Sequence, residues 1–150
     1  MPSDFTVILD RFVHLGNESG AFGAGDPSLF KGKDFDAPPF SCPNVNPEER
    51  AVLFFQSIDV DNTRNVIQIN GSNLFGGIPR SSTDSAVSRI WNGNVLLVEA
   101  AVLKASGNVL HLGARNNSGG TGGNVDDFGI DNVVIFYKTT SGGIIFGAEE

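Results

Sequence analysis

The sequence predicts an all-β protein, an antiparallel β-sandwich of jelly-roll type built as a single domain. Strand signals recur at roughly ten-residue spacing with turn residues between them, which is typical of sandwiches. No stretch shows the sustained 3.6-residue apolar period of a helix. Glycine and phenylalanine are abundant, at 19 and 12 of 150 residues. Glycine supplies turns, and Phe fills a core without needing a hydrogen-bond partner.

The N-terminal third predicts one strand followed by a long irregular segment. Apolar residues alternate with polar ones from Phe5, which predicts a strand reaching about Val13. Residues 16–47 hold five of the seven prolines and show no periodicity. A loop of that length is unusual inside a compact domain. We therefore expect one short strand within it and four side chains that pin it to the core: Phe22, Phe30, Phe35 and Phe40.

The middle of the chain begins with its strongest strand signal, residues 51–60 (AVLFFQSIDV). The first half of this run is apolar on both faces, as in a central strand between two layers. Residues 61–64 form a turn because Asp and Asn bond their own backbone there. Residues 66–69 then form the returning strand.

Asn70-Gly71 predicts a tight turn because both residues tolerate positive φ. Leu74 and Phe75 are expected to form a short strand after this turn. Residues 76–88 are polar and predict a loop.

Two further strands follow, each marked by an apolar face. A turn at Trp91-Asn92-Gly93-Asn94 is expected to precede the first of them, and residues 103–108 reverse the chain before the second. The predicted inward residues are Leu96, Val98 and Ala100, then Leu110, Leu112 and Ala114.

The last strand, residues 128–137, is expected to close the sandwich, and the shift of its apolar phase near Asp131 predicts a bulge or burial on both sides. The sandwich domain is therefore expected to span residues 1–138. Residues 139–150 form a tail with a Thr-Thr-Ser-Gly-Gly link and an apolar segment, Ile144 to Phe146.

Charge and composition exclude several classes of function. The net charge is −7, whereas nucleic acids and anionic membranes need a basic face, so we expect neither as a partner. No run approaches the roughly 18 apolar residues of a membrane span. We expect the single Cys42 to be a buried or loop thiol. Residues 1–4 show no basic and apolar leader, so no classical signal peptide is expected in this chain.

An ordered set of motifs suggests a family. It comprises Asn65-Val-Ile-Gln-Ile-Asn-Gly71, Trp91, the run Asn94-Val-Leu-Leu-Val98, the corner Leu103-Lys-Ala-Ser-Gly-Asn108 and the final Asp127-Phe-Gly-Ile-Asp-Asn-Val133. In this order they resemble the galactose-binding-domain-like jelly roll, the fold of many carbohydrate-binding modules. The resemblance covers a little over half of the chain, residues 51–138. It implies a protein that binds and does not catalyse, with loops that recognise sugar and a structural calcium near the last strand, held by a carboxylate at Asp131.

The residues themselves allow a metal site and also a simpler explanation. Asp126, Asp127 and Asp131 follow a glycine-rich loop, and Ca²⁺ takes six to eight oxygen ligands from carboxylates and backbone carbonyls. Alternatively, Asp126 and Asp127 cap the loop while Asp131 bonds a backbone amide at a bulge.

The candidate ligand residues also have two interpretations. Trp91 can stack on a sugar ring or belong to the core. Four polar residues can donate to hydroxyl groups or serve as ordinary loop residues: Arg80, Arg115, Asn116 and Asn117.

No nucleophile elbow, phosphate loop or zinc ligand set is present in the sequence, so we do not expect an enzyme. The leading hypothesis is a binding module for carbohydrate or glycan surfaces. The alternative is a self-assembling subunit of a filament, surface layer or virus-like particle, associating through residues 16–47 or the C-terminal tail. Either function favours an extracellular or particle-surface location.

Overall fold

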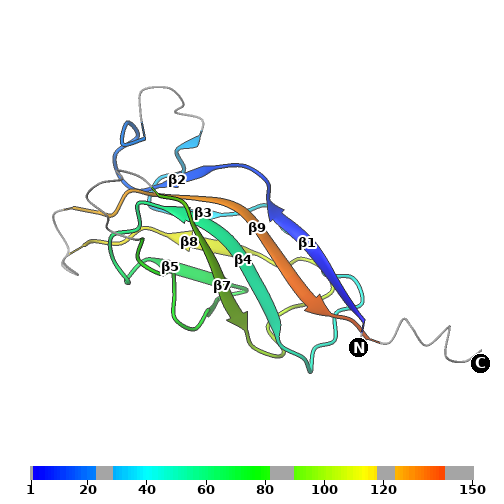
Figure 1. The fold of residues 1–150 in the computed structure, drawn as a ribbon. Coiled ribbons are helices and arrows are strands. Elements are labelled where there is room, and N and C mark those ends of the chain that lie inside the picture. The colour runs from blue at the N-terminus through cyan, green and yellow to red at the C-terminus, as the bar shows by residue number, and fades with distance from the viewer. Residues whose placement is uncertain (1, 23–28, 82–89, 118–123, 141–150) are drawn as a thin grey trace, which may run out of the picture.

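The structure is a computed structural model that describes residues 2–22, 29–81, 90–117 and 124–140. These residues form nine strands arranged in two antiparallel sheets, which enclose one apolar core (Figure 1). The predicted all-β antiparallel sandwich is therefore confirmed, whereas the jelly-roll connection pattern stays a prediction. Within the described ranges, no helix is long and apolar enough to cross a membrane.

Sheet A is the larger layer. In spatial order it contains β1 (Ser3–Leu9), β9 (Phe128–Lys138), β4 (Ala51–Ile58) and β7 (Asn92–Val98), and β2 (Val13–Leu15) pairs with the start of β9. Sheet B contains β3 (Asp34–Asp36), β8 (Leu110–Gly113), β5 (Val66–Ile69) and β6 (Ser72–Asn73), in that order.

The strand predicted at residues 128–137 is present as β9, and it lies inside sheet A between β1 and β4. It pairs with β1 and β2 along one edge and with β4 along the other. Its inward side chains are fully or almost fully buried: Phe128, Ile130, Val133, Ile135 and Tyr137. Burial of side chains of this size provides most of the free energy that holds two layers together.

The predicted irregularity in β9 is a β-bulge. Phe54 of β4 lies opposite Val134, and Gln56 lies opposite Asp131, so β9 uses three steps where β4 uses two. Asn132 absorbs the extra residue with a φ of 50°, a conformation that Asn tolerates better than most residues. Because of the bulge, Ile130 and Val133 both face the core although they are three residues apart.

Several local predictions are confirmed. Asn70 and Gly71 both have positive φ, 52° and 80°, in the turn that joins β5 to β6. Leu110, Leu112 and Ala114 are buried. Cys42 is buried, and desolvation raises the pKa of its thiol to about 11.

The described part of the segment 16–47 is pinned by its aromatic side chains, as expected. Phe40 is buried, and the rings of Phe22 and Phe30 stand edge-on to the His14 ring, with centroids 4.7 and 4.9 Å away. The expected short strand is β3, which carries Phe35.

Two strand predictions in the first half of the chain were wrong. The first strand ends at Leu9, and β2 is a separate strand that begins at Val13. The strand after the 61–64 turn does not return beside β4, because β5 crosses to sheet B.

The predictions at 74–75 and 91–94 were also wrong. The short strand β6 precedes Leu74, and Phe75 is 87% exposed. The expected turn at Trp91–Asn94 is instead the start of β7, since Asn92 and Gly93 pair with Ser57 and Gln56 of β4. Ala100 lies beyond the end of β7 and is exposed. At Asn92 and Gly93, pairing with the distant strand β4 overrode local turn propensity.

Gly16 gives a test of the packing between β2 and the start of β9. Its φ is 150°, and an added Cβ would overlap the Asp127 side chain and lie 2.9 Å from the Asp127 Cα. We predict that Gly16→Ala lowers the free energy of unfolding by about 1–3 kcal/mol. Gly20, where an added Cβ meets nothing within 4 Å, is the matched control, and Gly20→Ala should stay within about 0.5 kcal/mol of wild type. If chemical denaturation showed the same decrease in unfolding free energy for both variants, this account would be contradicted.

Candidate functional site

Asp126, the first predicted metal ligand, is buried at the end of the sandwich where β9 begins. Its Oδ2 accepts hydrogen bonds from the backbone amides of Asp61 (2.9 Å) and Asn62 (3.4 Å) and from the Asn65 side-chain amide (2.6 Å). Its Oδ1 is buried and has no hydrogen-bond partner among the described residues. Burial raises the pKa of this carboxyl, and the hydrogen bond from Asn65 opposes the shift. Asp126 therefore ties the 61–65 turn to the segment before β9.

Asp127 points to a different set of partners. Its Oδ1 lies 2.7 Å from His14 Nε2 and accepts a hydrogen bond from the Glu18 amide at 3.1 Å. The His14 side chain is almost fully buried. This pair fastens the start of the 16–47 segment to the chain before β9.

Asp131 lies at the bulge, where its Oδ1 accepts the Asn132 amide at 2.7 Å. The bond to a backbone amide is the simpler alternative weighed for this residue. Among the described residues, no group of three or more His, Cys, Asp or Glu side chains is placed to hold a metal ion. The three predicted ligands thus have separate partners and do not form a common donor set in the described part of the chain. Calcium stays a prediction of the sequence.

Two of the predicted sugar-binding residues belong to a network that joins loops. Asn117 Oδ1 accepts a hydrogen bond from Asn62 Nδ2 at 2.7 Å, and its carbonyl accepts one from Arg64 Nη1 at 2.8 Å. The Arg115 guanidinium forms an ion pair with Asp34 at 3.0 Å. Asn116 forms an isolated bridge with Val125. Arg115 and Asn117 therefore hold separate segments of the chain together, and their role toward a ligand stays a prediction.

Trp91 and Arg80 are the remaining predicted ligand residues. Trp91 is 44% exposed, and its ring meets Phe12 edge-on at 5.8 Å. It is therefore not a core residue, so one of its two interpretations fails. Arg80 is exposed in the segment that leads to Ser81, which exchanges hydrogen bonds with Val60. No described contact joins Trp91 or Arg80 to the Asn117 network.

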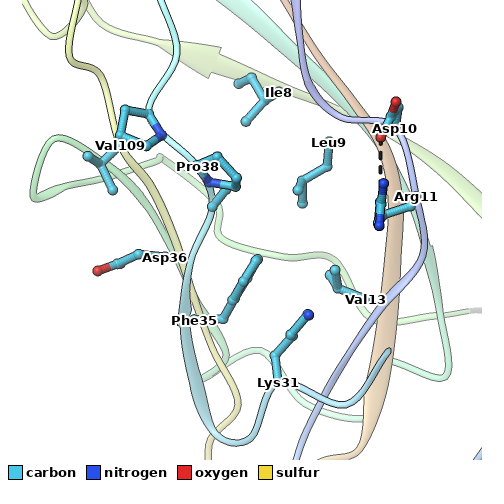
Figure 2. Close-up of a pocket in the computed structure, with 12 residues that line it drawn as sticks. Ile8, Leu9, Asp10, Arg11, Val13, Lys31, Phe35, Asp36, Pro38 and Val109 are labelled. Carbon is cyan, nitrogen blue, oxygen red and sulfur yellow. Dashed lines mark ion pairs between the residues drawn. The ribbon is translucent and has the colours of Figure 1, made fainter. Parts of the chain in front are cut away.

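A groove that the sequence did not predict lies between the edges of the two sheets. It has a volume of about 670 Å³, within the range of small-molecule pockets. Its lining comes from the end of β1, from β2, from Lys31 and β3 with the prolines that follow, and from Val109 (Figure 2). These segments are far apart in sequence, which explains why no motif marked the groove.

The groove is mostly apolar with charges at its rim. Figure 2 shows Leu9, Val13 and Phe35 pointing into the same space. The Lys31 ammonium lies 5.7 Å from the centre of the Phe35 ring. Asp36 also lines the groove, but its carboxylate is 2.7 Å from His111 Nδ1. Asp10 and Arg11 form an exposed ion pair at the other side.

A second unpredicted feature covers the outer face of sheet A. Eight apolar side chains form two rows across all four long strands, and we call this surface the outer grid. One row is Phe5, Phe136, Val52 and Leu97, and the other is Val7, Val134, Phe54 and Val95. Six of the eight are exposed, Val95 to 66% and Phe5 to 58%, and Phe54 and Val134 are half-buried.

Polar residues border the outer grid at both ends of the strands. At one end, Lys138 Nζ donates to Ser3 Oγ at 3.1 Å, and Arg50 pairs with Glu99 at 3.2 Å. At the other end, Asn132 Nδ2 donates to Gln56 Oε1 at 2.6 Å, next to Asp131. The outer grid is thus an apolar patch with a polar rim, an arrangement typical of interaction sites.

The sequence carried a signal for the outer grid. Runs such as Ala51–Phe55 are apolar at successive positions, and so are apolar on both faces of the strand. That pattern predicts burial between two layers, whereas in the described residues only the inner face is covered by sheet B. The same pattern recurs in 94–98 and 133–137.

Comparisons with known proteins found no matching family model, no matching curated protein and no matching solved structure. The resemblance to galactose-binding-like domains therefore stays an expectation from the sequence motifs.

The burial of Asp126 predicts a specific pH dependence of stability. Because its folded pKa is raised, the folded state binds this proton more tightly than the unfolded chain does. The contribution of Asp126 to stability is fully present below its ordinary pKa and is lost as pH rises through the raised value. We predict that the unfolding free energy of wild type, relative to Asp126→Asn, falls as pH rises through this window.

Denaturant titrations at a series of acidic pH values measure this difference, because the Asn side chain does not titrate. Asp10→Asn is the control for the change in net charge, because it removes one carboxylate at an exposed position. A difference between wild type and Asp126→Asn that is flat with pH, or rises, would show that the carboxyl is not destabilised by burial.

Proposed function

We propose that this protein is a non-catalytic module that acts by association, with the outer grid as the surface that binds another protein. The observation that carries this proposal is the set of eight apolar side chains on a solvent-facing sheet. Exposed patches of this kind mark interaction sites in soluble proteins because leaving them in water is costly.

The chemistry of the outer grid favours a protein partner over a sugar or a membrane. Valine, leucine and phenylalanine side chains offer no donors or acceptors for sugar hydroxyl groups. The net charge of −7 opposes binding to anionic lipid surfaces. A protein partner can cover the outer grid with apolar side chains of its own and satisfy the polar rim.

The test is site-specific photo-cross-linking in cells that make this protein naturally. A photoreactive residue in place of Val95, the most exposed member of the outer grid, should give a discrete adduct of higher mass. The control replaces Lys104, an exposed residue between β7 and β8, and should give none. No adduct from position 95, or equal adducts from both positions, would refute the proposal.

Carbohydrate binding is the second candidate, and the groove of Figure 2 is the observation that favours it. Phe35 supplies an apolar ring face, and Asp10, Arg11 and Lys31 supply polar groups around it. The residues that line this groove do not include Trp91 or Asn117.

We predict that Phe35→Ala weakens any glycan binding more than about tenfold, because the ring supplies stacking area. A glycan array followed by titration, with calcium and with a chelator, measures this. Phe75→Ala is the control, since Phe75 is exposed and does not line the groove. A chain that binds no glycan in either condition, or whose binding survives Phe35→Ala, would exclude the groove as a sugar site.

A further inference from the structure

We propose that the partner of the outer grid is a second copy of this chain, packed sheet to sheet about a two-fold axis. This inference rests on the proposed function and names its partner. The axis lies between sheet A of one copy and sheet A of the other. It is perpendicular to the strands and runs midway between the two rows, parallel to them. Closed two-fold dimers are the commonest protein assemblies, and their interfaces must be self-complementary.

The sizes of the side chains are complementary about this axis. The rotation places each strand over the same strand of the second copy, and it exchanges the two rows. Phe5 then lies over Val7 of the second copy, and the other facing pairs are Phe136 with Val134, Phe54 with Val52, and Leu97 with Val95. Every Phe ring therefore meets an aliphatic side chain and no ring meets a ring, so large residues alternate with small ones across the contact.

The charges at the two ends of the outer grid are also complementary. Lys138 lies at one end of β9, beyond Phe136, and Asp131 lies at the other end, beside the bulge. The same rotation exchanges these ends, so Lys138 of each copy approaches Asp131 of the other. A two-fold axis parallel to the strands would instead bring Lys138 over Arg50 of the second copy, which places like charges together.

The area is sufficient for a stable dimer. From the exposed fractions of its side chains and typical side-chain areas, the outer grid presents on the order of 500 Å² of apolar surface. With its polar rim it approaches the roughly 800 Å² per partner of a standard interface. A hollow of about 120 Å³, lined in part by Arg50, Val52 and Phe136, gives room for one side chain from the facing copy.

The experiment is sedimentation of the purified 150-residue chain from about 1 to about 500 µM, a range that brackets micromolar association. We expect a reversible monomer–dimer equilibrium. Val95→Asp should raise the dissociation constant by about tenfold or more, because it buries an unpaired charge. Val95→Thr, which keeps the shape of the side chain, should raise it less.

A charge exchange tests the axis itself. Lys138→Glu should raise the dissociation constant, since the introduced carboxylate would face Asp131 of the other copy. Adding Asp131→Lys in the same chain should restore the affinity of wild type, because each pair is then reversed. Only variants whose unfolding temperature matches that of wild type are compared, so that a loss of folding is not mistaken for a loss of the dimer contact.

The outcomes separate this inference from the function it rests on. A purified chain that stays monomeric at every concentration overturns the inference. If position 95 nevertheless gives a cross-linked adduct with a different protein, the outer grid remains an interaction surface, and without an adduct both proposals fail. A dimer that survives Val95→Asp but is lost in Ile145→Asp assigns the contact to the C-terminal tail. A double charge variant no tighter than Lys138→Glu rejects this axis.

Discussion

The pairing of β9 on both of its edges is the interaction on which the structure depends. This strand joins β1 and β2 to β4, so without it sheet A would separate into β1, β2 and the β4–β7 pair. Its inner side chains fill the core against sheet B, and Val134 and Phe136 on its other face form the centre of the outer grid. The same eleven residues therefore stabilise the fold and build the surface for which we propose a function.

The end of the sandwich where β9 begins is held by polar contacts. Asp126 joins the 61–65 turn to the chain before β9, Asn65 Oδ1 accepts a hydrogen bond from the Arg115 amide at 2.9 Å, and Asp127 holds His14. Buried polar networks are costly where they are only partly satisfied, and Asp126 Oδ1, which has no hydrogen-bond partner among the described residues, is the costly atom at this end. The acidic pair that suggested a metal site in the sequence thus serves, in the described residues, mainly to fix the loops from which β9 departs.

The sequence predicted the layers better than the sites. Alternating or continuous apolar runs marked β4, β8 and β9, and Asn70-Gly71 marked its turn, because these signals are local. The crossing of the chain from β4 to β5 depends on contacts between residues far apart in sequence. The same is true of the pairing that makes Asn92 and Gly93 part of a strand. The groove and the outer grid depend on which distant strands become neighbours. Trp91 and Asn117 were predicted to bind a ligand because of their residue types. The outer grid, in contrast, is built mainly from ordinary Val and Phe residues.

The bulge at Asn132 carries a further consequence for folding. In most sheets a one-residue slip is penalised because it turns polar side chains inward. In sheet A both faces are apolar along β9 and β4, so a slipped pairing would still bury hydrocarbon, and this penalty is weak. Asn tolerates a positive φ better than the Val, Ile and Phe residues around it, so the φ of 50° at Asn132 favours a bulge at this residue and disfavours alignments that would move the bulge onto a β-branched or aromatic neighbour.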